Sequence, residues 1–176
     1  PATEYFCRGY VMYKKGGATL VAYSRVLSFT TGEGDSGALP EGVVIENGVL
    51  KTWPNTSIPE SGHVTLPSEV TQIDRYAFSG CSRLKSITFP NKLKEIGGYA
   101  FYACTQLQEV TIPNSVTRIG DYAFNGCSNL HTVTLPSKLQ VLSAYVFKGC
   151  QALKAIHTKG VHTIDICAFE GCTRLD

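Results

Sequence analysis

The chain contains 176 residues, of which 43% are hydrophobic and only 17% are charged, compared with roughly 25% charged residues in ordinary globular proteins. A formal net charge of +2 gives no reason to expect nucleic acid or an anionic membrane surface as a partner. No apolar run approaches the roughly 20 residues of a membrane-spanning helix, so we expect no membrane insertion.

Residues 1–39 form a first segment that contains no repeat. Tyr10–Tyr13 and Thr19–Tyr23 have the apolar and aromatic composition of strands, and Lys14–Ala18 between them has the composition of a hairpin loop. The polar, glycine-rich stretch Gly32–Gly37 is typical of a flexible linker. The first segment is therefore predicted to be a β-hairpin followed by a linker.

The stretch Gly32–Gly37 also matches two short functional motifs. Its glycines have the G-x-G-x-x-G spacing of phosphate-binding loops, but Ala38-Leu39-Pro40 follows where a helix would have to receive the phosphate. It contains Gly-Asp-Ser-Gly, the tetrapeptide around the nucleophile of chymotrypsin-like proteases. That family has its histidine upstream, whereas no histidine precedes His63 in this chain. We therefore interpret the stretch as a linker rather than as a site.

Residues 40–66 form a second segment with a hairpin signal at its centre. Val44–Glu46 and Val49–Lys51 flank Asn47-Gly48, a dipeptide that accepts positive φ at both central positions of a two-residue turn. The first repeat follows directly. We expect this hairpin to cover the open end of the repeats, where core residues and unpaired backbone would otherwise be exposed.

A unit of 23 residues repeats through the third segment, residues 67–176. The repeat is marked by Pro67, Pro90, Pro113 and Pro136, and within it by Phe78, Phe101, Phe124 and Phe147. A fixed period in the twenties is typical of a solenoid, in which one unit cannot bury its apolar face alone and stacked neighbours bury it together. The chain begins at Pro1 and stops within a repeat, so we expect it to be a processed or excised piece.

Each repeat is predicted to contain a strand, a second extended run and one turn. Ile87–Phe89 alternates with a period of two, which predicts a short strand whose Thr88 points away from the core. Val70 and Ile73 mark the second extended run. The Tyr-Ala-Phe segment that follows is expected to form a single helical or 3₁₀ turn, because it is too short for more. Strands one coil apart should pair in parallel and in register, at about 4.8 Å.

This pattern resembles the BspA-like class of leucine-rich repeat. The consensus of that class, roughly Leu-Pro-x-x-Val-x-x-Ile-x-x-x-Ala-Phe-x-x-Cys-x-x-Leu-x-x-Ile, is matched from Leu66-Pro67 to Ile87 and in each later unit. The resemblance covers residues 64–176, extends less closely to residues 40–63, and implies a solenoid of the leucine-rich repeat type. Proteins of that family are mostly secreted or attached to the surface of host-associated bacteria and some protists. The resemblance therefore implies an extracellular or cell-surface location and a role in adhesion.

Cysteine forms one column of the repeat, made up of Cys81, Cys104, Cys127, Cys150 and Cys172. A disulfide ladder or a metal site would be the functional interpretations. However, the chain has no C-x-x-C pair, and side chains in one column do not face one another as a disulfide requires. We interpret the column as small buried residues, with Cys167 and Cys172 as the exception most able to pair. No metal and no cofactor are expected.

Tyrosines and histidines offer two further alternatives. Tyr76, Tyr99, Tyr122 and Tyr145 form a column beside the Ala-Phe turn. We expect them to seal the edge of the core, the alternative being an aromatic binding face. His131 and His157 lie on or beside strands of adjacent coils, where a metal-binding or pH-sensitive surface is conceivable, but no carboxylate or thiolate cluster accompanies them. We interpret the histidines as polar surface residues.

The outward positions of the predicted strands form the candidate binding face. This face consists of Lys85, Ser86, Thr88, Gln108, Glu109, Thr111, His131, Thr132, Thr134, Lys154 and His157. If the strands line the inner curve of the solenoid, the face is polar, mildly basic and rich in hydrogen-bonding groups, and solenoids often bind through such faces. The alternative is that threonine is simply a favourable exposed strand residue.

We expect a secreted or cell-surface binding module that recognises a protein or a glycan on host or neighbouring cells. The alternative is a structural spacer that holds another domain away from the cell envelope and has no ligand of its own. A catalytic role is not expected, because no nucleophile with a general base and no carboxylate pair is evident in the sequence.

Overall fold

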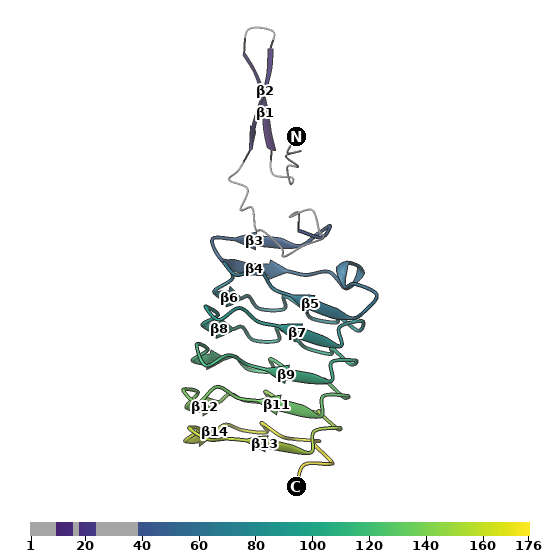
Figure 1. Cartoon of the computed structure of the whole chain (residues 1–176), viewed down its shortest axis with the longest axis vertical. Helices are drawn as coiled ribbons and strands as arrows, with labels where there is room; N and C mark the ends of the chain where they lie inside the picture. The colour runs from purple at the N-terminus through teal and green to yellow at the C-terminus, as the bar shows by residue number, and fades with distance from the viewer. Residues whose placement is uncertain (1–9, 16–17, 24–38) are drawn as a thin grey trace. The chain divides into compact units, whose positions relative to one another are not determined.

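The chain consists of two compact units, residues 1–40 and residues 41–176, and Figure 1 shows both. The structure is a computed structural model, and the residues that it describes are 10–15, 18–23 and 39–176. The expected linker Gly32–Gly37 lies outside these residues, as does Cys7. Within the described residues, no helix combines the length and the apolar character needed to cross a membrane.

The first unit contains the predicted β-hairpin. Strands β1 (Tyr10–Lys15) and β2 (Ala18–Tyr23) pair antiparallel, with Tyr10 opposite Tyr23 and Lys15 opposite Ala18. Both strands extend further toward the loop than the sequence suggested, because Lys14, Lys15 and Ala18 join the ladder.

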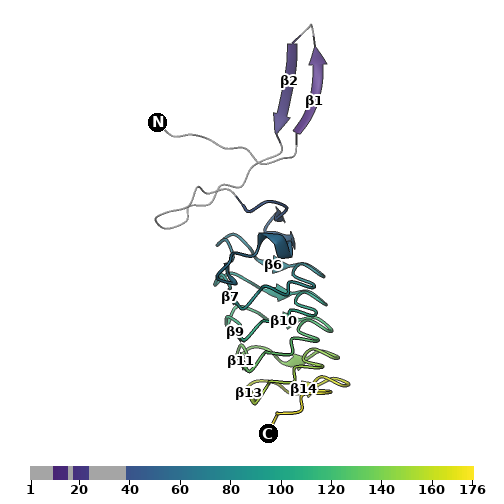
Figure 2. The same cartoon turned by 90° about the vertical axis from the view of Figure 1, so that its right-hand side faces the viewer.

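The second unit is a solenoid with paired strands along each of two sides of the stack (Figures 1 and 2). The first sheet is parallel, in the order β13 (Ala155–His157), β11 (Thr132–Thr134), β9 (Glu109–Thr111), β7 (Ser86–Thr88) and β5 (His63–Thr65). Partners in adjacent strands are 23 residues apart, for example Val110 and Val133. The predicted solenoid with parallel, in-register strands is therefore confirmed.

Two-residue strands form most of the second sheet. Its order is β10 (Arg118–Ile119), β8 (Glu95–Ile96), β6 (Gln72–Ile73), β4 (Val49–Thr52) and β3 (Val44–Glu46), and β12 (Val141–Leu142) pairs separately with β14 (Thr163–Ile164). Strands β3 and β4 are antiparallel and joined by Asn47 and Gly48, whose φ angles of 51° and 77° are those of the predicted two-residue turn. Because β4 pairs in parallel with β6, this hairpin continues the sheet at its N-terminal end.

A column of stacked phenylalanines runs through the core. The ring centroids of Phe78 and Phe101 are 5.0 Å apart, as are those of Phe101 and Phe124, and the ring planes differ by 9° and 2°. All three side chains are fully buried. Trp53 stacks on Phe78 at 5.6 Å and so extends the column into the segment before the repeats. Successive coils therefore share one interior, as predicted from the repeat.

The Tyr-Ala-Phe segment differs in detail from the expected helical or 3₁₀ turn. It is a run of β-turns, and η1 (Asn55–Ser57) is the one 3₁₀ helix among the described residues. The physical reason is that Tyr76, Tyr99 and their equivalents, Cys167 included, have φ between 56° and 64°, a left-handed conformation that no right-handed helix contains. The turn is instead joined to the next coil by backbone hydrogen bonds, such as that from the Phe101 N–H to the carbonyl of Ala123 at 2.8 Å.

The cysteine column is a ladder of thiol hydrogen bonds. The Sγ of Cys104 donates to the carbonyl of Phe78 at 3.1 Å, and that of Cys127 donates to the carbonyl of Phe101 at 3.2 Å. Each of these carbonyls also accepts a backbone N–H of its own coil, from Cys81 and Cys104 respectively, so the thiol adds a second bond that links two coils. All the described cysteines, Cys167 and Cys172 included, are free thiols. The column is therefore structural, as expected, and the possible pairing of Cys167 with Cys172 does not occur in this structure.

Burial makes these thiols poor nucleophiles. Desolvation raises the pKa of Cys81 to about 11 and that of Cys127 well above the ordinary 9.0. We predict that the native protein at pH 8 leaves Cys81, Cys104 and Cys127 unlabelled by iodoacetamide, and that denaturant exposes all three, as peptide mass spectrometry would measure. Because the unfolded chain ionises first, the protein should lose stability as the pH rises above about 9. Rapid native labelling of Cys127 would contradict the prediction.

Candidate functional site

The outward face of the first sheet brings the predicted binding residues together. In each strand the central residue, such as Val110 in β9, points into the core, and its two neighbours point outward. The register aligns Glu109 with Thr132, and Thr111 with Thr134. Two outward columns therefore run along the sheet, and a third column precedes each strand.

All the predicted residues lie on this face. Those that are exposed are Lys85, Thr88, Gln108, Glu109, Thr111, His131, Thr132, Thr134, Lys154 and His157, whereas Ser86 is half-buried. The face thus carries hydroxyl, amide and imidazole groups together with two lysines and one glutamate. It offers many hydrogen-bond donors and acceptors, but no aromatic anchor of the kind that dominates tight protein interfaces.

His63 extends this face and was missed as a candidate. It lies on β5, opposite Ser86, and its Nδ1 is 2.8 Å from the Ser86 hydroxyl. Its Nε2 is 3.2 Å from the hydroxyl of Thr65 and 3.3 Å from that of Thr88. Val64-Thr65-Leu66 already matched the strand pattern in the sequence, so applying the 23-residue period one unit earlier would have placed His63 in the Ser86 column.

The contact between Ser86 and His63 does not form a catalytic triad. In a triad, a carboxylate orients the second ring nitrogen of the histidine and stabilises its charged form. Here threonine hydroxyls occupy that place, and the histidine is exposed to solvent. The network orders the imidazole on the surface, where it can bind a polar group of a partner.

The two histidines considered for a metal or pH-sensitive surface lie in different columns. His157 pairs with Thr134, whereas His131 precedes Thr132, whose hydroxyl is 2.9 Å from the His131 Nδ1. Within the part of the chain that the structure describes, no three His, Cys, Asp or Glu side chains are gathered in a way that could hold a metal ion.

The tyrosine column lies at the edge of the core, as expected, and its side chains are only partly buried. Tyr99, Tyr122 and Tyr145 are half-buried, and Tyr76 is 49% exposed. Their rings stack, with centroids 4.9 Å apart for Tyr76 and Tyr99 and 4.6 Å apart for Tyr99 and Tyr122. Burial raises the pKa of the Tyr99 phenol, helped by the neighbouring phenols of Tyr122 and Tyr76. The column is both a structural stack and an aromatic surface.

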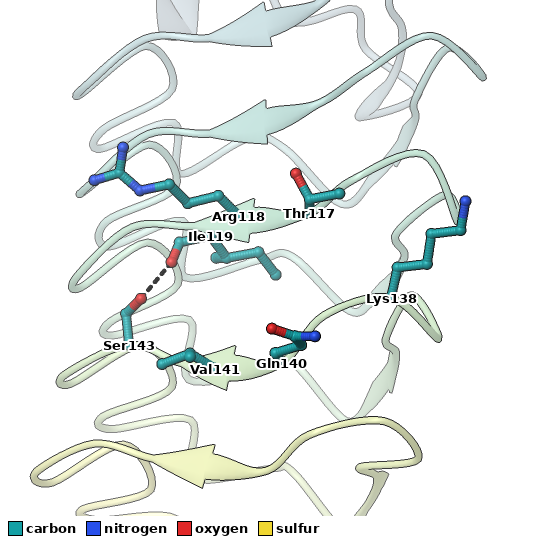
Figure 3. Close-up of a pocket in the computed structure, with 7 residues that line it drawn as sticks. All are labelled: Thr117, Arg118, Ile119, Lys138, Gln140, Val141 and Ser143. Carbon is teal, nitrogen blue, oxygen red and sulfur yellow. Dashed lines mark hydrogen bonds between the residues drawn. The ribbon is translucent and has the colours of Figure 1, made fainter.

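A hollow of about 510 Å³ opens where the second sheet is interrupted (Figure 3). It is lined by Thr117, Arg118, Ile119, Lys138, Gln140, Val141 and Ser143, from β10 and β12 and the turns beside them. Strands β10 and β12 are not paired, and the Ser143 hydroxyl donates to the carbonyl of Ile119 (Figure 3). Arg118 forms an ion pair with Glu95 at 3.0 Å, so Lys138 is the cation of the hollow that has no ion-pair partner within residues 39–176.

Comparisons with known proteins agree on one family for this chain. A model of the BspA type leucine rich repeat region matches residues 56–176 in 6 copies. No curated protein matches the sequence.

Solved structures of bacterial leucine-rich repeat proteins resemble the chain. A leucine-rich repeat protein from Eubacterium ventriosum shares 27% identity over 74% of this chain and 36% of its own, with a TM-score of 0.68. The leucine-rich repeat protein of T. pallidum shares 29% identity over 73% of this chain and 71% of its own, with a TM-score of 0.56. A leucine-rich cell surface protein from Faecalibacterium prausnitzii has the same fold, at 20% identity over 87% and 54% of the two chains and a TM-score of 0.50. The chain spans little more than a third of the Eubacterium protein.

Proposed function

The chain belongs to the BspA-type leucine-rich repeat family, and from this membership we propose that it is a binding module at the cell surface or outside the cell. Its partner is a protein or a glycan on host or neighbouring cells. We propose no enzymatic activity for the module. A solved structure of the same fold that is described as a cell surface protein supports the proposed location.

The observation that carries the proposal is the polar outward face of the first sheet. Apart from the half-buried Ser86, its columns are exposed along β7, β9, β11 and β13, and a parallel sheet fixes them at regular spacing. A rigid backbone reduces the ordering cost that a partner would otherwise have to offset on binding. Hydroxyl, amide and imidazole groups on such a support suit a partner rich in polar groups.

The test replaces the centre of this face with acidic side chains. We expect the variant with Thr111→Glu, His131→Glu and Thr134→Glu to remain folded and to lose at least tenfold in affinity for the ligand of the wild type, about 1.4 kcal/mol. The ligand is found by screening the wild type on immobilised matrix proteins and on a glycan array, and the affinity is measured by surface plasmon resonance.

A matched control carries the same change of charge on the opposite side of the solenoid. Thr117→Glu, Gln140→Glu and His162→Glu also alter exposed polar residues, but these residues directly precede β10, β12 and β14. The control should bind as the wild type does. If the first variant keeps its affinity, the face is not the binding site, and if neither screen yields a ligand, the spacer is the better description.

A further inference from the structure

We propose that the tyrosine edge, defined as Tyr76, Tyr99, Tyr102, Tyr122 and Tyr145 with Arg75, is a second binding site, and that it takes a saccharide chain. This site is separate from the polar face of the first sheet. The proposal does not depend on that face binding anything.

The rings of this edge form a pre-ordered aromatic surface. The centroids of Tyr122 and Tyr145 are 4.5 Å apart with planes 9° from parallel, which continues the stack described above. Tyr102 packs against Tyr99 from the side, at 5.8 Å and 55°. Stacked rings held by their neighbours lose little conformational freedom when a partner binds.

The backbone does not explain why tyrosine occupies this column. Tyr76, Tyr99, Tyr122 and Tyr145 all have left-handed φ angles, which are costly for a residue with a Cβ. A second left-handed column exists in the same turns, and there the chain uses Gly80, Ala103, Gly126, Gly149 and Gly171. Tyrosine is therefore present for its ring and hydroxyl, despite the strain.

Part of the edge is open to a partner. Tyr76 is 49% exposed and Tyr102 is 41% exposed. The guanidinium carbon of Arg75 is 5.0 Å from the ring centroids of both Tyr76 and Tyr99. It lies over both rings in a cation–π contact, so the edge presents a cation together with the exposed parts of Tyr76 and Tyr102.

The polar groups of the edge are also largely unused. Arg75 donates to the Tyr76 hydroxyl at 3.3 Å and forms no ion pair within residues 39–176. The hydroxyls of Tyr99 and Tyr122 have no hydrogen-bond partner within the same residues. The edge thus combines two exposed aromatic rings with a row of phenols and a guanidinium that can still donate.

This combination fits a saccharide better than a protein. A stable protein interface covers roughly 800 Å² on each partner and has an apolar centre. Here the exposed large side chains of the edge are the two tyrosines Tyr76 and Tyr102, and the remaining tyrosines are half-buried, so the edge offers no broad apolar centre. A pyranose ring instead needs one aromatic face for its C–H bonds, and its hydroxyls pair with phenol and guanidinium groups.

The experiment compares a variant without the open rings with one that keeps them. Tyr76→Asn with Tyr102→Ala removes both exposed rings, and asparagine tolerates the left-handed backbone at residue 76. Tyr76→Phe with Tyr102→Phe retains the rings. The full chain is applied to mammalian and microbial glycan arrays, and the best saccharide is then titrated with saturation-transfer NMR. Thermal unfolding checks that each variant is folded.

We expect the wild type to bind at least one saccharide, with transfer to its C–H protons from tyrosine rings. The Asn/Ala variant should lose at least tenfold in affinity, and the Phe/Phe variant should stay within a few fold. The acidic variant of the first sheet, with Thr111, His131 and Thr134 replaced, should still bind this saccharide, which separates the proposal from the one above. The proposal would be overturned if the wild type bound no saccharide on either array, or if the Asn/Ala variant bound the saccharide as tightly as the wild type.

Discussion

Replacing Phe101 with alanine is expected to lower the free energy of unfolding by about 3–5 kcal/mol. Phe101 is fully buried between Phe78 and Phe124, with both centroids at 5.0 Å, and Phe89 packs edge-on at 6.0 Å. Removing its ring would create a cavity in the middle of the stack, and the parallel coils on either side cannot close it without breaking their ladders. Chemical denaturation followed by far-UV circular dichroism would measure the loss.

Phe169 is the matched control for this substitution. It stands at the last position of the same column, is half-buried, and stacks on Phe147 alone at 5.8 Å. Phe169→Ala should therefore cost less, about 1–2 kcal/mol. In a stack where each coil contacts only its neighbours, the central variant should also reduce the cooperativity of unfolding. Equal losses for the two variants would refute the idea that shared burial holds the coils together.

The solenoid was predictable because its signal is repeated. Each apolar column, such as Ile87, Val110 and Val133, recurs at the same spacing, and a proline stands at the same place after four of the five strands of the first sheet. The alternation of side chains along a strand then fixes which residues point outward. That is why the residues of the predicted face do lie together on one sheet, although nothing in the structure tests whether they bind.

The details that were not predictable depend on how closely the coils approach one another. Left-handed backbone positions are usually occupied by glycine or asparagine. The tyrosines at such positions therefore gave no indication in the sequence that their φ is positive. The thiol of Cys127 reaches a carbonyl that is distant in sequence, and this contact appears only when the coils are stacked. The interruption of the second sheet likewise appears only in the stacked coils, where the Ser143 hydroxyl donates to the Ile119 carbonyl and β10 does not pair with β12.

Gly120 occupies a position where the structure leaves no space for a side chain. A Cβ there would lie 2.5 Å from the backbone nitrogen of Gly98 and 2.9 Å from its Cα. Backbone atoms in a paired coil cannot move aside, so we expect Gly120→Ala to cost about 3 kcal/mol and to separate β10 from β8. Thermal unfolding and amide hydrogen exchange at Gly120, whose N–H donates to the Ile96 carbonyl at 2.8 Å, would measure both effects.

Gly126→Ala is the control for the conformational part of this cost. Gly126 has a φ of 75°, but its nearest neighbour to a new Cβ is 3.6 Å away, and Ala103 already stands at the equivalent position one coil earlier. That substitution should cost only about 1 kcal/mol. If both glycine variants lose the same stability, close approach of the coils is not what excludes a side chain at Gly120.

Ser143 offers the converse experiment, because it carries a Cβ at the position that Gly97 and Gly120 occupy in the two preceding coils. The N–H groups of these glycines each donate to the preceding coil at 2.8 Å, whereas at Ser143 the hydroxyl donates instead and β10 and β12 do not pair. Ser143→Gly should let β12 approach β10 and narrow the hollow between them, with slower amide exchange at residues 140 and 143. One coil further, Asp165 keeps its bond to Leu142 in a repeat of 22 residues. Asp74, at the same position one coil before Gly97, also carries a Cβ and still donates from its N–H to the Leu50 carbonyl at 2.9 Å. The steric argument therefore applies only where neighbouring coils approach as closely as they do at Gly97 and Gly120, and unchanged exchange in the Ser143→Gly variant would contradict it.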